Sequence, residues 1–195
     1  MDKTAALSSI KTRIENELVC ELKDNATNMV FGKGNPDAPI LFVGEAPGEK
    51  EDLSGLPFVG AAGKQLDKLL NSIGLTLDGC YVANILKYRP PKNRDPVVEE
   101  IRNHTPYLIE QIKVIKPSVI CTLGNFSTKF VLAGFNVDGM KKIEGVSKLH
   151  GAIQHVVMDG EEIVVVPLYH PAACLYRPQL RTVLEEDFQK IKTIL

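Results

Sequence analysis

The chain has 195 residues, of which 44% are hydrophobic and 24% charged, and its formal net charge is −1. This balance is typical of a globular protein with a substantial core, and the length favours a single domain over residues 1–195. The sequence argues against a membrane protein, because no apolar run approaches the roughly 20 residues needed to cross a bilayer. The net charge of −1 restricts any DNA-binding surface to a local basic patch.

The first predicted element is a helix at the N-terminus, followed by buried strands. Residues 1–19 form an amphipathic pattern without the apolar core or cleavage site of a signal peptide, so we expect a cytoplasmic protein. Four short runs rich in Val, Ile or Leu are typical of strands buried on both faces of a parallel sheet. These runs are residues 39–43, 80–86, 118–123 and 163–168.

Helical patterns lie between and after these strands. The predicted helices are residues 61–73, 96–115, 125–132 and 179–195. Pro96 favours the start of the second helix, and Pro117 ends it. The alternation predicts an α/β fold, a three-layer α/β/α sandwich around a four-stranded, mainly parallel sheet. Asp159-Gly160 predicts a hairpin within residues 156–165, and residues 138–151 are predicted to be an irregular connection.

The cysteines do not suggest a zinc site or a disulfide framework. Cys20, Cys80, Cys121 and Cys174 are far apart in the chain, and disulfides are rare in cytosolic proteins of this size. Cys80 and Cys121 fall within strand-like runs. We therefore expect both to be buried structural thiols.

In open α/β sheets, binding sites form beyond the carboxyl ends of the strands, and the first such segment here is the loop of residues 44–63. Its glycines and prolines suit a backbone that approaches a ligand closely, but it lacks the spacing of a phosphate or dinucleotide loop. The alternative is a surface turn with solvated carboxylates. Phe58, between Pro57 and a glycine-rich helix start, favours contact with a planar ligand.

Asn84 ends the second predicted strand and offers both a donor and an acceptor to an amide-like edge, although a structural cap is the alternative. A stiff basic segment follows it. Four cations there are candidates for contact with a phosphate backbone, the alternative being a solvated charge run. These cations are Lys87, Arg89, Lys92 and Arg94.

His170 follows the last predicted strand, so its side chain should reach the same crevice. A neutral imidazole there can donate a hydrogen bond to charge that develops on a leaving group, although a structural role is the alternative. Leu175, Tyr176 and Arg177 follow it and are candidates for a wedge that enters a base stack.

Together these segments resemble the family 4 uracil-DNA glycosylases of bacteria and archaea. The matching text covers almost the whole chain in the family's order and comprises residues 27–70, 81–101, 119–127 and 170–175. The resemblance implies the uracil-glycosylase α/β/α fold, a base pocket at the carboxyl end of the sheet, and DNA containing uracil as the partner. It implies that Phe58 stacks on the extruded uracil, that Asn84 reads its Watson–Crick edge, and that His170 stabilises the departing anion at O2.

Further roles come from the same resemblance. Backbone groups of Glu45 and Ala46 should line the pocket, and Glu51 matches an acid that crowds the position of thymine's methyl group. The segment 171–177 resembles the family's DNA-intercalating loop, which includes Leu175 and Arg177. Ala46 stands where better-known uracil glycosylases carry Asp, so our hypothesis is a dissociative route driven by stabilisation of the leaving group.

The chain departs from the family at the four-iron, four-sulfur cluster, which is usually held by four cysteines. The aligned positions are Glu17, Cys20, Tyr88 and His104, so only Cys20 is retained. Such clusters are bound by Cys thiolates, with His replacing Cys only in special cases. We therefore predict no iron–sulfur cluster and no other cofactor or metal, and we expect ordinary side chains to pack this region.

Three functions remain open at this point. The first is an active uracil-DNA glycosylase, expected to act as a monomer because one pocket acts on one flipped base. The second is a non-catalytic module that binds uracil in DNA. The third is a glycosylase that prefers another deaminated base. Retention of Phe58, Asn84 and His170 favours the first.

Overall fold

The computed structural model describes residues 2–195, so Met1, where the predicted N-terminal helix begins, lies outside the described residues. Its centre is a six-stranded sheet with the order β1-β3-β2-β4-β6-β5. The four inner strands are parallel, and they are β2 (Ile40–Gly44), β3 (Tyr81–Asn84), β4 (Val119–Leu123) and β6 (Glu161–Leu168). The two edge strands, β1 (Lys33–Gly34) and β5 (Gln154–Met158), are antiparallel to their neighbours.

The predicted strand count of four is therefore too low, although the four predicted runs match the four parallel strands. β1 has only 2 residues, which is too short to produce a pattern in the sequence. β5 alternates between buried and exposed side chains and pairs with β6 as the predicted hairpin. Asp159 and Gly160 form its turn, with positive φ values of 52° and 84° that suit a tight hairpin.

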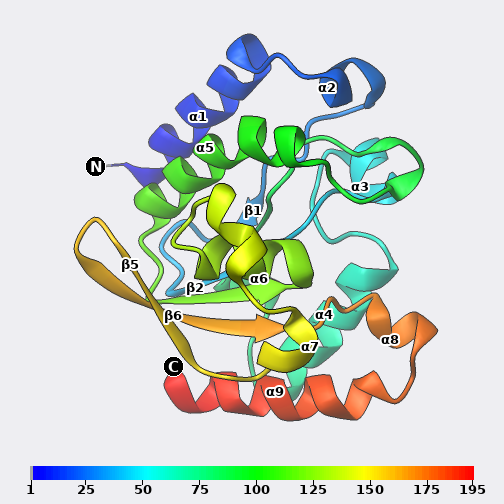
Figure 1. The fold of residues 1–195 in the computed structure, drawn as a ribbon, viewed down its shortest axis with the longest axis vertical. Helices are drawn as coiled ribbons and strands as arrows, with labels where there is room; N and C mark the ends of the chain where they lie inside the picture. The colour runs from blue at the N-terminus through cyan, green and yellow to red at the C-terminus, as the bar shows by residue number, and fades with distance from the viewer. Residues whose placement is uncertain (1) are drawn as a thin grey trace.

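Helices cover both faces of the sheet (Figure 1). They are α1 (Lys3–Glu17), α2 (Glu21–Asn25), α3 (Glu49–Ser54), α4 (Ala61–Ser72), α5 (Val98–Ile115), α6 (Asn125–Leu132), α7 (Val146–Leu149), α8 (Ala173–Tyr176) and α9 (Leu180–Ile194). The long helices match the predictions to within a few residues. The segment 138–151, predicted to be irregular, contains a 3-10 turn and the four-residue α7.

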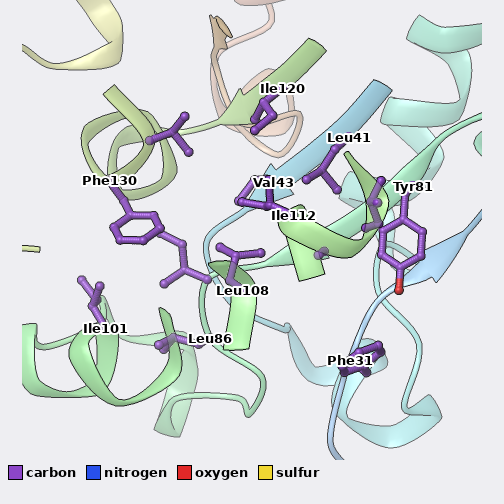
Figure 2. Packing of buried hydrophobic residues seen from close by; sticks show 14 of the residues in the cluster. Phe31, Leu41, Val43, Tyr81, Leu86, Ile101, Leu108, Ile112, Ile120 and Phe130 are labelled. Atoms are coloured by element: carbon purple, nitrogen blue, oxygen red, sulfur yellow. The ribbon is translucent and has the colours of Figure 1, made fainter. Parts of the chain in front are cut away.

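Two separate apolar clusters confirm the three-layer arrangement. Alternate residues of each inner strand point to opposite faces, so Leu41 of β2 packs toward α1, α5 and α6, as Figure 2 shows for Leu41, Leu108 and Phe130. Phe42 faces the other way, toward α4 and α9, where its ring stacks on Phe188 with centroids 6.1 Å apart. Because both faces are covered, every residue of β2 is buried.

The burial expected for two of the cysteines is confirmed. Cys80 and Cys121 are both fully buried, and burial raises the pKa of the Cys80 thiol to about 11. These thiols are therefore protonated and unreactive at neutral pH. None of the helices within residues 2–195 combines the length and the apolar character that crossing a bilayer requires.

The loop between β2 and α4, which contains α3, is held by a buried carboxylate. Asp52 is 5% exposed, and its Oδ1 atom accepts hydrogen bonds from the backbone N–H groups of Thr27 and Asn28, at 2.9 and 3.2 Å. The Asn28 side-chain amide in turn donates to the backbone carbonyl of Asp52. Asp52 thus fixes α3 against the segment that precedes β1.

We predict that Asp52→Ala lowers the free energy of unfolding by about 1–3 kcal/mol, because it leaves two backbone N–H groups without their acceptor. Asp52→Asn is the matched control, since its amide oxygen can still accept both hydrogen bonds, and it should retain most of the stability. Urea denaturation followed by circular dichroism measures both variants. Equal losses in the two variants would contradict this role for the Asp52 oxygen.

Candidate active site

The carboxyl ends of β2, β3 and β6 deliver the predicted base-binding residues to one edge of the sheet. A cavity of about 350 Å³ opens there. Its lining includes all six residues predicted for the base pocket: Glu45, Ala46, Glu51, Phe58, Asn84 and His170. A larger hollow of about 680 Å³ near the amino end of β3 contains none of them. The six residues are thus brought together from distant segments of the chain, the first being Glu45 and the last His170.

Phe58 is held in the pocket wall by a strained backbone. Its φ angle is +53°, which is unusual for a residue with a bulky side chain. The ring is 6% exposed and stacks on His170, with centroids 6.2 Å apart and an interplanar angle of 25°. A Cβ at Gly63 would collide with the Phe58 backbone, so this glycine permits the turn.

Glu51 supports that turn, a role that the sequence did not reveal. Its Oε1 atom accepts hydrogen bonds from the backbone N–H groups of Val59 and Gly60, at 2.9 and 2.7 Å. These donors belong to the start of α4, where helices leave N–H groups free. The carboxylate therefore anchors the backbone immediately after the pocket aromatic. Its predicted contact with a methyl group stays a prediction.

Asn84 is the last residue of β3 and is 3% exposed. In the parallel ladder it lies beside Gly44, the last residue of β2. A Cβ at Gly44 would collide with the Asn84 Oδ1 atom and would lie 3.0 Å from the Phe58 ring. The absence of a side chain at Gly44 is what leaves room for both pocket residues.

His170 is a neutral donor in this setting. Its Nδ1 atom accepts a hydrogen bond from the Ala172 backbone N–H at 3.2 Å, which assigns the ring proton to Nε2. Burial lowers the pKa of His170 to about 4, an effect that the Glu51 carboxylate opposes. At neutral pH the ring is uncharged and has one N–H to donate.

Glu45 is the acidic group whose ionisation the pocket alters most clearly. Burial, with a smaller effect from the Asp95 carboxylate, raises the pKa of Glu45 to about 7. Its backbone carbonyl accepts from the Leu86 N–H at 2.9 Å, which fixes the chain next to Ala46. Glu45 and His170 also line an adjoining hollow of about 540 Å³ that extends to Tyr176 and Arg177.

The prediction that Lys87 contacts DNA is wrong. Its side chain is 0% exposed and points into the protein, where Nζ donates to the Asn84 carbonyl and to Gln111 Oε1, at 2.8 and 2.6 Å. Burial lowers the pKa of Lys87 to about 7. It cannot reach a phosphate group without leaving the core.

The three other predicted cations are accessible to different degrees. Lys92 is exposed at the tip of the loop, with a φ angle of +55°. Arg89 is partly buried and donates to Asn93 at 2.8 Å, and Arg94 lines the pocket while donating to Glu100 at 2.9 Å. Lys92 is therefore the cation of this loop best placed for a phosphate group, and contact with DNA stays a prediction for all three.

The segment after His170 forms the short helix α8 at the rim of the pocket. Leu175 and Tyr176 are 50% and 83% exposed, and Arg177 is exposed beside them. Exposed apolar side chains next to a base pocket fit the predicted wedge. Of these two apolar side chains, that of Tyr176 is the more exposed.

The four positions aligned with cluster ligands do not form a set that fits an iron–sulfur cluster. The Cys20 Sγ atom lies 3.4 Å from His104 Nε2, and His104 Nδ1 accepts from the Lys87 backbone N–H at 2.9 Å. Tyr88 packs edge-on against His104, with ring centroids 6.1 Å apart. Glu17 instead pairs with Arg13 at 3.4 Å.

One thiol, a buried phenol and a histidine whose two nitrogens are already engaged provide a poor set of donors for four irons. Within residues 2–195, no three His, Cys, Asp or Glu side chains are grouped as a metal site either. Burial lowers the pKa of His104 to about 4, so this histidine is a neutral hydrogen-bonding group in the core.

Comparison with known proteins agrees with this site. The family model of the uracil DNA glycosylase superfamily matches residues 31–192. A type-4 uracil-DNA glycosylase of Archaeoglobus fulgidus is 46% identical over 95% of this chain and 92% of its own length. Those of Saccharolobus solfataricus and Thermotoga maritima are 47% and 37% identical, over 90% and 95% of this chain and 80% and 93% of their own lengths. This chain therefore belongs to the uracil DNA glycosylase superfamily.

Proposed function

We propose that this protein is a uracil-DNA glycosylase, a DNA N-glycosylase that releases uracil from DNA and so starts base excision repair. The observation that carries the proposal is the meeting of Phe58, Asn84 and His170 in one cavity of about 350 Å³. The family membership and the type-4 uracil-DNA glycosylases among the relatives support it.

Base recognition follows from Phe58 and Asn84. The target nucleotide must leave the stack, which costs a few kcal/mol and less when the base is mismatched. The Phe58 ring offers an apolar face to the flipped base. The Asn84 amide offers one acceptor to uracil N3–H and one donor to uracil O4. Cytosine presents the opposite pattern at these two atoms, so its binding would leave polar groups unpaired.

Cleavage breaks the bond between C1′ and N1, and the electron pair leaves with uracil as an anion. The His170 Nε2–H is the donor that stabilises the negative charge at O2. Because Ala46 supplies no base, departure of uracil precedes attack by water in our mechanism. Glu45, with a pKa of about 7, then accepts the proton that water loses as it adds to C1′.

The surroundings of the pocket fit a DNA substrate. Arg89, Lys92 and Arg94 are assigned to the phosphate backbone on one side. Leu175 and Arg177 on α8 are assigned to the space that the flipped base vacates on the other. We infer that the protein acts as a monomer, because every residue assigned to the reaction comes from one chain.

We further propose that this enzyme works without an iron–sulfur cluster. The support is the hydrogen-bonded contact between Cys20 and His104, with Tyr88 packed against it, at the aligned positions. These side chains join the α1–α2 connection to α5 and to the loop after β3.

For catalysis, we expect His170→Ala to lower the single-turnover rate of uracil release by about 10²–10³-fold, because the anion loses its preorganised donor. His155→Ala is the matched control, since His155 is exposed and pairs with Glu162 at 3.1 Å, and its rate should be unchanged. Release is measured on oligonucleotides with one uracil, followed by alkali. A near-normal rate in His170→Ala would reject the role, and uracil-dependent binding without any release by the native chain would indicate a binding module.

For pH dependence, we expect kcat/KM to rise about tenfold per pH unit below a pH of about 7 and to level off above it, because Glu45 must be ionised to accept a proton. His170, whose pKa is about 4, should add no inflection at the ordinary histidine value. Glu45→Gln should be slower and should lack the inflection near 7. An unchanged inflection in this variant would assign the ionisation to another group.

For the cofactor, we expect protein purified without oxygen to contain no iron above trace and to show no visible absorption band. The matched control carries Glu17→Cys, Tyr88→Cys and His104→Cys, which together with Cys20 complete the ligand set. Metal analysis and absorption spectra of both proteins provide the measurement. A band in the native protein that disappears on reduction would contradict the proposal.

A further inference from the structure

The group whose structural position is least expected from the sequence is Lys87. Its side chain is fully buried, and Lys is rarely found in that state unless it is paired. The Nζ atom lies 2.8 Å from the Asn84 carbonyl, 2.6 Å from Gln111 Oε1 and 3.5 Å from the Phe31 carbonyl. An ammonium group has three donors, and here they face three oxygens.

The rest of Lys87 is fixed as firmly as its ammonium group. Its backbone N–H donates to His104 Nδ1 at 2.9 Å, and its carbonyl accepts from the Val30 N–H at 2.8 Å. Gln111, which receives the ammonium, also donates to the Phe31 carbonyl at 3.1 Å. These contacts fix the position of Lys87. Its Nζ atom donates to the carbonyl of Asn84, three residues earlier in the chain, and therefore holds that carbonyl in place.

The consequence for the pocket lies in one peptide group, that between Asn84 and Ile85. Its carbonyl oxygen accepts from Lys87 Nζ, and its N–H donates to the Gly44 carbonyl at 3.0 Å. With both ends held, this peptide cannot rotate, and the direction in which the Asn84 side chain leaves the backbone is set. The missing Cβ of Gly44 then leaves a space for the Asn84 Oδ1 atom.

We propose that Lys87 is a positioning residue for the reaction, one that holds the Asn84 backbone from inside the protein so that the Asn84 amide meets the uracil edge without rearrangement. This inference rests on the proposed function for the role of Asn84. Positioning of this kind is worth a large rate factor, because a displacement of about 1 Å at a reacting group can lower the rate about 10²-fold.

The test compares two substitutions within the same buried cluster. Lys87→Met keeps the length of the side chain but removes every donor, so the Asn84 carbonyl loses its partner. Gln111→Met is the matched control, because it disrupts the same cluster while leaving the contact between Lys87 and Asn84 in place. Both variants are assayed at a temperature where circular dichroism shows them folded.

We expect Lys87→Met to lower the single-turnover rate of uracil release by roughly tenfold to hundredfold with little change in DNA affinity. Gln111→Met should stay within about twofold of the native rate, because the hydrogen bond from Lys87 Nζ to the Asn84 carbonyl does not involve Gln111. In an Asn84→Ala background, Lys87→Met should have less than about a twofold effect, because it acts through Asn84. Two results would overturn the inference. One is an equal loss of rate in Lys87→Met and Gln111→Met, and the other is the same loss of rate from Lys87→Met in the Asn84→Ala background as in the native protein.

A second readout separates this inference from the proposed function. The Asn84 side-chain amide gives a pair of NMR signals, which are assigned by their absence in Asn84→Ala. We expect these signals to shift or broaden in Lys87→Met and to be unchanged in Gln111→Met. If the native protein releases no uracil, the proposed function fails, and these signals still decide whether Lys87 positions Asn84. Unchanged signals in Lys87→Met would reject the positioning.

Discussion

The pairing of Gly44 with Asn84, where β2 and β3 end side by side, is the constraint on which the site depends. A strand pair in this register brings the residue that reads the base next to a position without a side chain. A Cβ at Gly44 would overlap the Asn84 Oδ1 atom and would press against the Phe58 ring. Shifting the register by one residue would turn Asn84 toward the opposite face of the sheet.

Burial around this strand pair also decides which groups carry charge. It lowers the pKa of His170 to about 4 and raises that of Glu45 to about 7, so a neutral donor and a partly ionised acid face the same cavity. Both shifts follow from removing groups from water, which disfavours their charged forms. Hydrogen bonds in such a site are stronger than in water, which favours an anion that forms only as the bond breaks.

The sequence predicted those features that local pattern determines. The four parallel strands follow from runs of Val, Ile and Leu, and the long helices follow from apolar stripes and prolines. The resemblance to a family and the rule about strand ends together identified Phe58, Asn84 and His170. All three line the cavity.

What the sequence did not reveal depends on distant partners. Lys87 lies in a run of cations, a pattern that predicts a surface group. Its Nζ atom instead donates to Gln111, which is 24 residues away, and approaches the carbonyl of Phe31, which is 56 residues away. The anchoring of the Phe58 turn by Glu51 depends on backbone donors that a pattern of residue types does not display. β1 is too short for any periodicity, and its place in the sheet comes from pairing with β3 alone.

The central claim is that one pocket accepts uracil and that the protein cleaves the bond to the sugar. The most direct test incubates the native protein with oligonucleotides that differ only in one base, which is uracil, cytosine or thymine, and identifies any free base by mass spectrometry. We predict release of uracil alone, from single strands and from pairs with G or A, and fastest where the base is least well paired. Release of none of the three bases, or of cytosine as readily as uracil, would contradict the account.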